Sequence, residues 1–124
     1  MPANVLDLAA RVMPLLLADE GPVGETLRAQ YARSRVVSGK LTGSGFFIDF
    51  EVDADVPLTE PRYLAGGDVH LDVEGSPYGG CVLHVRDGRL WCLEVYTFGD
   101  WREGAAGVTL SYPLPLSRFK GPAA

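Results

Sequence analysis

The sequence has no long apolar run and no cluster of basic residues. Its apolar stretches fall far short of the about 18 residues that a membrane-spanning helix needs. The N-terminal region carries acidic residues where a secretory signal would carry basic ones. With 16 acidic against 11 basic residues and a net charge of −5, the chain also lacks the clustered Lys and Arg that bind a phosphate backbone. We therefore expect a cytoplasmic protein with neither a membrane nor a nucleic-acid partner.

Cysteine is also scarce, since the chain contains only Cys81 and Cys92. If Asp87 and Gly88 form a two-residue turn, the two cysteines become diagonal neighbours on one face of a hairpin, about 7 to 8 Å apart. A disulfide needs a Cα separation of roughly 4.4 to 6.8 Å. The sequence therefore predicts two free, buried thiols.

Motifs of catalysis and of cofactor binding are missing as well. Ser44 lies between two glycines but lacks the Gly-x-Ser-x-Gly elbow of a nucleophile. The glycines at 39, 43 and 45 do not form a Gly-x-Gly-x-x-Gly loop before a helix. We infer no cofactor, and these absences favour a protein that is not an enzyme.

The composition that remains is that of one ordinary globular domain spanning residues 1–124. Hydrophobic residues make up 47% and charged residues 22%, close to the average for folded proteins. Nine of the basic residues are Arg, a usage typical of GC-rich bacterial genes. The last residues, 113–124, contain three prolines and are predicted to form an extended tail.

Two helical segments are predicted before the strands. Within residues 5–17 the apolar residues follow a helical spacing, and Pro14 is expected to kink this helix or to begin a second one. The buried positions predicted for it are 6, 9, 10, 13, 16 and 17. A further helix over residues 24–34 is expected to bury Leu27 and to turn Gln30 outward.

From residue 35 onward the hydrophobic period changes to two, which indicates strands. The central feature is a hairpin over residues 81–97, because Asp87-Gly88 joins two apolar runs and both residues tolerate the positive φ of a tight turn. Further strands are predicted over 35–42, 46–53, 68–74 and 108–112, with a loop over 54–66 and a turn over 76–80. Phe46, Ile48, Phe50 and Val52 are expected to face the core.

Helices followed by strands predict an α+β fold. We expect two short N-terminal helices packed on one face of a curved antiparallel sheet of five or six strands, in a mostly meandering order. Such a sheet has edge strands, and an unpaired edge can form a homodimer by pairing with a second copy.

Acidic side chains follow the polar face of two predicted strands. The first row is Asp49, Glu51 and Asp53, followed by Asp55, and the second is Asp68, His70, Asp72 and Glu74. If the two strands are neighbours, these residues form one acidic surface, which would attract a basic partner. His and carboxylates are also ligands for zinc or manganese, but strand alternation alone accounts for this row, so no metal is assigned.

The first functional hypothesis is therefore a non-enzymatic interaction protein of the immunity or antitoxin type. It would hold a basic protein on the acidic face, with Phe98 and Trp101 as aromatic anchors. The second hypothesis is a small-ligand binder or enzyme with a pocket between helices and sheet. Its polar groups would be Glu94, whose pKa burial would raise, and His70, with Tyr96 as a further pocket residue. His84 is expected to be a half-buried packing residue opposite Trp91.

The central hairpin also resembles the C-terminal hairpin of a family of small, uncharacterised bacterial proteins that carry V-x-D-G-x-L-x-x-L-E-V-Y. The matching residues here are Val85, Asp87, Gly88, Leu90, Leu93, Glu94, Val95 and Tyr96. The resemblance implies a short helical N-terminus before the hairpin and assigns no activity to any residue.

Overall fold

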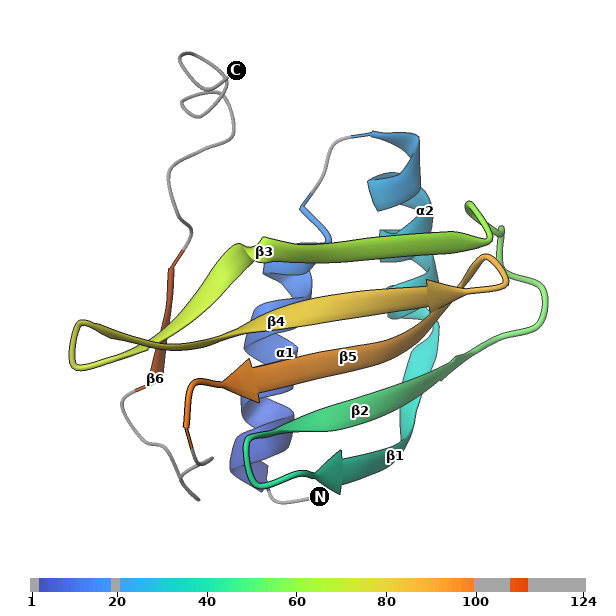
Figure 1. Ribbon diagram of the computed structural model, residues 1–124. Coiled ribbons are helices and arrows are strands. Elements are labelled where there is room, and N and C mark those ends of the chain that lie inside the picture. Colours follow the sequence, from blue (N-terminus) through green and yellow to red (C-terminus); the bar gives the residue numbers. More distant parts are fainter. Residues whose placement is uncertain (1–2, 19–20, 100–107, 112–124) are drawn as a thin grey trace, which may run out of the picture.

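The computed structural model describes residues 3–18, 21–99 and 108–111, and it has the α+β fold that the sequence predicts (Figure 1). Two N-terminal helices lie on one face of a curved antiparallel sheet. The elements are α1 (Ala3–Leu16), α2 (Pro22–Ala32), β1 (Ser34–Leu41), β2 (Gly45–Val52), β3 (Arg62–Val73), β4 (Ser76–Arg86), β5 (Arg89–Thr97) and β6 (Val108–Ser111). The predicted tail over 113–124 lies outside the described residues.

The strand order is β1-β2-β5-β4-β3-β6. The hairpin neighbours β1–β2, β3–β4 and β4–β5 confirm the mostly meandering order, whereas β2–β5 and β3–β6 are neighbours that lie far apart in the chain. The loop after β2 carries the chain past the β4–β5 turn. There the Thr59 N–H donates to the Gly88 carbonyl at 3.0 Å, and the Gly88 N–H donates to the Pro61 carbonyl at 3.2 Å. As a result β3 begins on the far side of β4 instead of beside β2.

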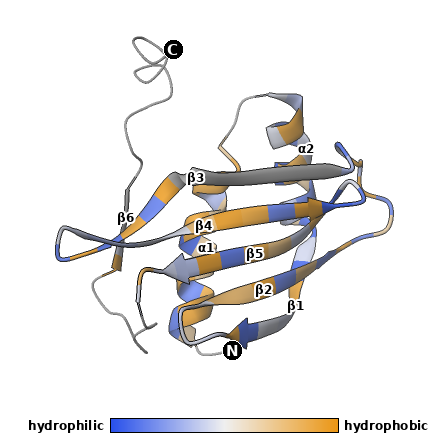
Figure 2. Cartoon of the chain, in the orientation of Figure 1, coloured by the Kyte–Doolittle hydropathy of each residue, from blue (hydrophilic) through white to orange (hydrophobic). Residues whose placement is uncertain are grey.

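The core lies between the helices and the face of the sheet turned toward them, here called the inner face. Phe46, Ile48, Phe50 and Val52 of β2 are buried there, as predicted. Buried positions alternate with less buried ones along much of β2, β4 and β5, and Figure 2 shows hydrophilic residues interrupting the hydrophobic ones in these strands. The opposite face of the sheet, here called the outer face, carries the remaining side chains of these strands.

The buried stripe of α1 agrees with the predicted one at positions 9, 13, 16 and 17 and differs at the remaining positions. The structure buries Val5, Leu8, Ala9, Val12, Met13 and Leu16, together with Leu17 just beyond the helix. Leu6 and Ala10, expected inside, are exposed. Pro14 neither ends the helix nor begins another, because it lies in the last turn, where the backbone continues to Leu16. Neither helix is long and apolar enough to cross a membrane, within the described residues.

In α2, Gln30 is the main departure from the prediction. Its side chain is fully buried, whereas the sequence pattern predicted that it would point to solvent. Its side-chain amide donates to the carbonyls of Pro57 at 2.7 Å and Gly88 at 2.9 Å, and its oxygen accepts the Leu90 N–H at 2.7 Å. Hydrogen bonds to three backbone groups therefore compensate the burial of this polar side chain.

The central hairpin turns at Asp87 and Gly88, both with positive φ, as predicted. Its register contains a β-bulge that the pattern did not predict: Val85 pairs with Leu90 but His84 pairs with Cys92, so Trp91 is an extra residue in β5. A one-residue insertion moves the following side chains to the opposite face.

Because of this bulge, the prediction that both cysteines lie on one face of the hairpin is wrong. Cys81 pairs with Val95 and joins the inner core, while Cys92 pairs with His84 on the outer face. Both thiols are free and buried, as predicted, but they lie on opposite faces of the sheet and not on one.

Two further boundaries differ from the predictions. β3 begins at Arg62, so the loop predicted over 54–66 is wrong in its second half. The β3–β4 hairpin turns at Glu74 and Gly75, both with positive φ, before the predicted turn over 76–80. Glycine, Asn and Asp adopt a positive φ more readily than other residues. Among the described residues, Glu74 and Asp87 are the two residues other than glycine that adopt it.

Candidate functional site on the outer face of the sheet

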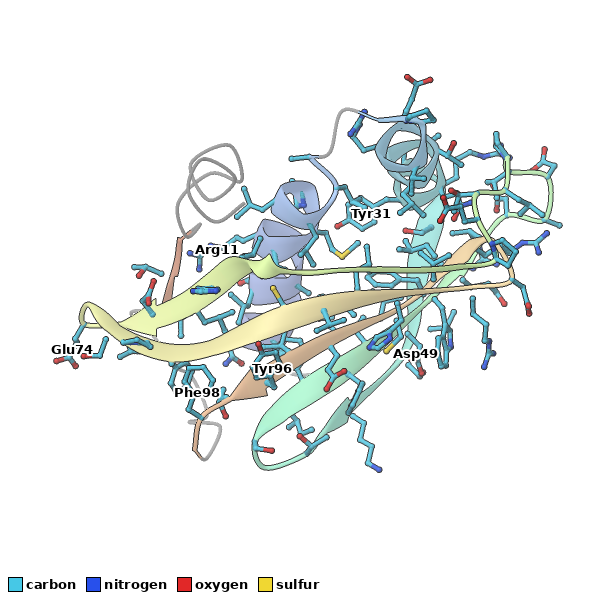
Figure 3. The ribbon with its side chains drawn as sticks, turned by 45° about the horizontal axis from the view of Figure 1, so that its top comes forward. Arg11, Tyr31, Asp49, Glu74, Tyr96 and Phe98 are labelled. Carbon is cyan, nitrogen blue, oxygen red and sulfur yellow. The ribbon has the colours of Figure 1, made fainter. Side chains whose placement is uncertain are left out.

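No described helix covers the outer face, which points toward the viewer in Figure 1. Its side chains come from strands that are distant in sequence but paired in space: Phe47 pairs with Glu94, Asp49 with Cys92, and Glu94 with Val82. Figure 3 shows Asp49, Tyr96 and Phe98 on the side of the sheet away from the helical residues Arg11 and Tyr31. The two predicted groups of functional residues therefore have to be located on this face one by one.

The prediction of one continuous acidic surface is wrong. Its premise was that the two acidic strands are neighbours, but β5 and β4 separate β2 from β3. The acids of the first row, in β2 and just after it, are also largely paired with cations. Arg33 contacts Asp53 at 3.0 Å and Asp55 at 2.6 Å, and Arg35 pairs with Glu51. The pKa of the Arg33 guanidinium is raised, chiefly by the charge of Asp55.

Asp49 is the exception in this first row. It forms no ion pair with Arg or Lys among the described residues, and its carboxylate accepts a hydrogen bond from the Ser38 hydroxyl at 2.6 Å. Asp49 lies half-buried beside Cys92, its partner across β2 and β5. It is therefore the member of the first row whose carboxylate lies on the outer face without a described Arg or Lys paired to it.

The second acidic row lies on the far part of the β3–β4 hairpin, here called the arm (residues 70–80). His70 and Glu74 are exposed there and Asp72 is partly buried, while the side chain of Asp68 lies outside the described residues. Glu74 occupies the tip of the arm (Figure 3). The arm therefore places acidic side chains at one end of the outer face.

The arm meets two aromatic residues at the end of β5. The Phe98 N–H donates to the Tyr78 carbonyl of the arm at 2.9 Å, and Gly80 pairs with both Tyr96 and His70. The structure thus brings together predicted residues from two parts of the chain. Trp101, the other predicted anchor, lies outside the described residues.

Tyr96 and Phe98 form what we call the aromatic corner. Their ring centroids are 6.1 Å apart at an interplanar angle of 60°, and the residues are 37% and 69% exposed. The Tyr96 ring lies over Gly80, because a Cβ built on that glycine would stand 2.4 Å from the Tyr96 hydroxyl oxygen. A glycine in the strand therefore makes room for an aromatic side chain that lies across it.

Glu94 occupies the middle of the outer face. Its Oε1 lies 3.0 Å from Nε2 of His84, and both side chains are about one-third exposed. This placement contradicts the second sequence hypothesis, which put Glu94 in a pocket between helices and sheet. The bulge at Trp91 is the physical reason, since it shifts Glu94 away from Cys81 and the core.

At the other end of the face, Trp91 is already covered by a cation. The Arg86 guanidinium carbon lies 4.1 Å from the Trp91 ring centroid. His84 packs against the same ring edge-on, at 6.1 Å, which agrees with the half-buried packing role predicted for it. Among the described residues, the outer face thus has one aromatic group covered by Arg86 and another, the aromatic corner, that no described cation covers.

The surroundings of Cys92 on this face do not activate its thiol. Burial, and to a smaller extent the neighbouring Asp49 and Glu94 carboxylates, raise the pKa of its thiol to about 12. The reactive form of cysteine is the thiolate, which is scarce at neutral pH in such surroundings. Among the described residues no group of three or more His, Cys, Asp or Glu is placed to hold a metal ion.

Comparisons with known proteins add no assignment: no family model, no curated protein sequence and no solved structure matches this chain. The hairpin resemblance therefore stays a prediction. Sequence reasoning missed the Arg86–Trp91 contact and the role of Gly80. The pair Gly79-Gly80 inside an apolar strand was the available signal, because glycine there marks a bulge or a close approach.

Proposed function

We propose that this protein is a non-enzymatic interaction protein that holds a basic protein partner on the outer face of its sheet. The observation that carries the proposal is the aromatic corner, with Phe98 69% exposed beside Tyr96. Large aromatic side chains exposed together are a feature of binding surfaces, where Tyr and Trp supply much of the affinity.

Charge supports a basic partner. The aromatic corner lies between the acidic arm, ending in Glu74, and the half-buried carboxylates Glu94 and Asp49. Within the described residues none of these three carboxylates forms a salt bridge with Arg or Lys. Complementary charge of this kind speeds encounter and selects the partner more than it adds affinity.

An immunity or antitoxin protein in the cytoplasm is the specific form of this proposal. The homodimer predicted from an edge strand is a separate proposal, and β1 is the edge that it concerns. β1 has exposed Val36, Val37 and Leu41, but also a bulge at Val36–Ser38 and Lys40, features that natural edges use against pairing.

The test compares capture of proteins from a lysate of the source cells by matched variants. Phe98→Ala and Glu74→Lys alter the outer face. Leu58→Ala removes an apolar side chain that is 52% exposed in the loop after β2, and Glu60→Lys makes the same charge change in that loop. Bound proteins are identified by mass spectrometry at low salt and at about 0.5 M salt, where the Debye length falls to a few Å.

We expect one basic protein to be retained by the unaltered chain and by both loop variants. It should be lost with Phe98→Ala and Glu74→Lys, and its capture should weaken at high salt. A partner that binds all four variants equally would place the docking surface elsewhere and would contradict the proposal.

A further inference from the structure

The aromatic corner has the geometry of a site for a cationic side chain. Because the rings of Tyr96 and Phe98 are inclined by 60° with centroids 6.1 Å apart, they form two walls of an open angle instead of a closed stack. Both residues are exposed, so a guest group can reach the ring faces. Aromatic faces carry a negative potential that attracts cations within about 6 Å of the ring centroid.

Glu94 lies on the same face of β5 as Tyr96, with its Oε1 in contact with His84. Glu94 precedes Tyr96 by two residues on β5, and side chains two apart on a strand point the same way, roughly 6.5 to 7 Å apart. In the described part of the chain the ion-pair partner of Glu94 is His84, which carries a charge only when protonated. A cation placed on the rings would therefore find a carboxylate that no Arg or Lys neutralises.

The same face already holds one guanidinium group in this manner. Arg86 lies 4.1 Å above the Trp91 ring at the opposite end of β5. At the aromatic corner, by contrast, no described Arg or Lys lies over either ring. Within the part of the chain that the structure describes, one exposed aromatic site is thus covered by an arginine and the other is not.

We propose that the aromatic corner and Glu94 form a subsite for an arginine side chain of the partner. The inference rests on the proposed function and deepens it by naming the chemical group that is recognised. Arginine fits better than lysine because its planar guanidinium stacks on an aromatic face and can at the same time present N–H donors to a carboxylate.

The test uses small probes, so that it does not depend on knowing the partner. N-acetyl-arginine N-methylamide and its neutral analogue N-acetyl-citrulline N-methylamide are titrated into the full chain, and the aromatic ¹³C–¹H NMR signals of Tyr96, Phe98 and Trp91 are followed. The citrulline probe has nearly the same shape without the charge. Variants Phe98→Ala, Glu94→Gln and, as a control, Leu58→Ala are titrated in the same way.

We expect the arginine probe to shift the signals of Tyr96 and Phe98 in a saturable way and to leave Trp91, which Arg86 covers, unchanged. Phe98→Ala should weaken this binding by roughly two- to fivefold, the factor of an exposed cation–π contact. Glu94→Gln should weaken it by up to about fivefold, the factor of an exposed ion pair. Leu58→Ala should have no effect. Equal shifts with citrulline, or no saturable shift with arginine, would overturn the subsite.

The outcomes separate this subsite from the proposed function. If the arginine probe fails while Phe98→Ala still abolishes capture of a basic protein, the docking surface is correct and the arginine subsite is wrong. If Phe98→Ala leaves capture unchanged, the proposed function fails, whatever the probe does.

Discussion

Gly79 and Gly80 are neighbours in β4, yet an added methyl group would meet different atoms at each. At Gly79 a Cβ would stand 1.9 Å from the Tyr96 carbonyl oxygen, which belongs to the backbone of β5. At Gly80 it would stand 2.4 Å from the Tyr96 hydroxyl oxygen, at the end of a side chain that can rotate. A methyl group at Gly79 would therefore push β4 and β5 apart, whereas one at Gly80 would only displace the ring of Tyr96.

We therefore predict that Gly79→Ala lowers the free energy of unfolding by about 2 kcal/mol or more, because a methyl group forced against backbone overpacks the sheet. Gly80→Ala should lower it by less than about 1 kcal/mol but change the NMR signals of the Tyr96 ring. Urea denaturation and aromatic NMR spectra measure the two effects. Equal destabilisation by both variants would contradict this account of the ring position.

The two thiols predict how stability depends on alkaline pH. Burial raises the pKa of Cys81 and of Cys92 from 9.0 to about 12 in the folded chain. A raised thiol pKa means that folding favours the protonated form. Its stabilising contribution is therefore complete below about pH 9 and is lost as the pH rises toward 12, at up to about 1.4 kcal/mol per pH unit for each thiol.

Replacing one thiol should reduce this dependence. The free energy of unfolding, measured in urea at about pH 8 and about pH 10, should fall less steeply for Cys81→Ala than for the unaltered chain. The comparison is between the two slopes, so a constant loss from the vacated volume does not affect it. Identical slopes would mean that Cys81 titrates in the folded chain as it does in the unfolded one.

At the scale of the elements, the single side chain of Gln30 connects α2 to the loop after β2 and to the β4–β5 hairpin. Gln30 donates to carbonyls of the loop after β2 and of the β4–β5 turn, and it accepts the Leu90 N–H. These contacts fasten the loop that carries the chain from β2 to β3. They thereby help to establish the order in which β5 and β4 separate the two acidic rows.

Gln30→Met keeps most of the side-chain volume but removes all three hydrogen bonds. We predict a loss of about 2 to 3 kcal/mol in the free energy of unfolding, because the Pro57 carbonyl and the Leu90 N–H would lose their partner in Gln30, whereas the Gly88 carbonyl would keep the Thr59 N–H. Glu25→Ala, at an exposed position of the same helix, is the control and should change stability by less than about 0.5 kcal/mol. Denaturation in urea measures both, and a small effect at Gln30 would show that water replaces these bonds.

Local chemistry explains which elements the sequence could predict. Asp87-Gly88 specifies its turn by backbone preference, and Phe46, Ile48, Phe50 and Val52 specify a buried face by alternation. The bulge at Trp91 has no such signal in the sequence, because the apolar residues around it are compatible with the strand register both with and without the bulge. That one residue decided whether Glu94 faces the core or the outer face.

At the scale of the whole molecule, the missing information was long-range pairing. Residues of β2 and β5 are far apart in the chain, and the order β1-β2-β5-β4-β3-β6 depends on which distant strands meet. The acids and aromatics of the candidate site can be read from the sequence, but their positions relative to one another cannot. The contact of Phe98 with Tyr78 of the arm and the pairing of Asp49 with Cys92 of β5 both depend on the strand order. The site exists only after β5 joins the two halves of the sheet.

The outer face should therefore act unevenly toward a partner, with its binding energy concentrated at the aromatic corner. Arg86 covers Trp91, so a partner that used this ring would first have to displace the guanidinium group. The rings of Tyr96 and Phe98 are open, and the acidic arm adjoins them. We predict that Phe98→Ala weakens binding of the captured partner by about 2 kcal/mol, the size of an interface hot spot, and that Trp91→Ala weakens it by less than about 1 kcal/mol. Isothermal titration calorimetry of the purified partner measures both values, and a larger effect of Trp91→Ala would move the centre of the docking surface to the Arg86 end.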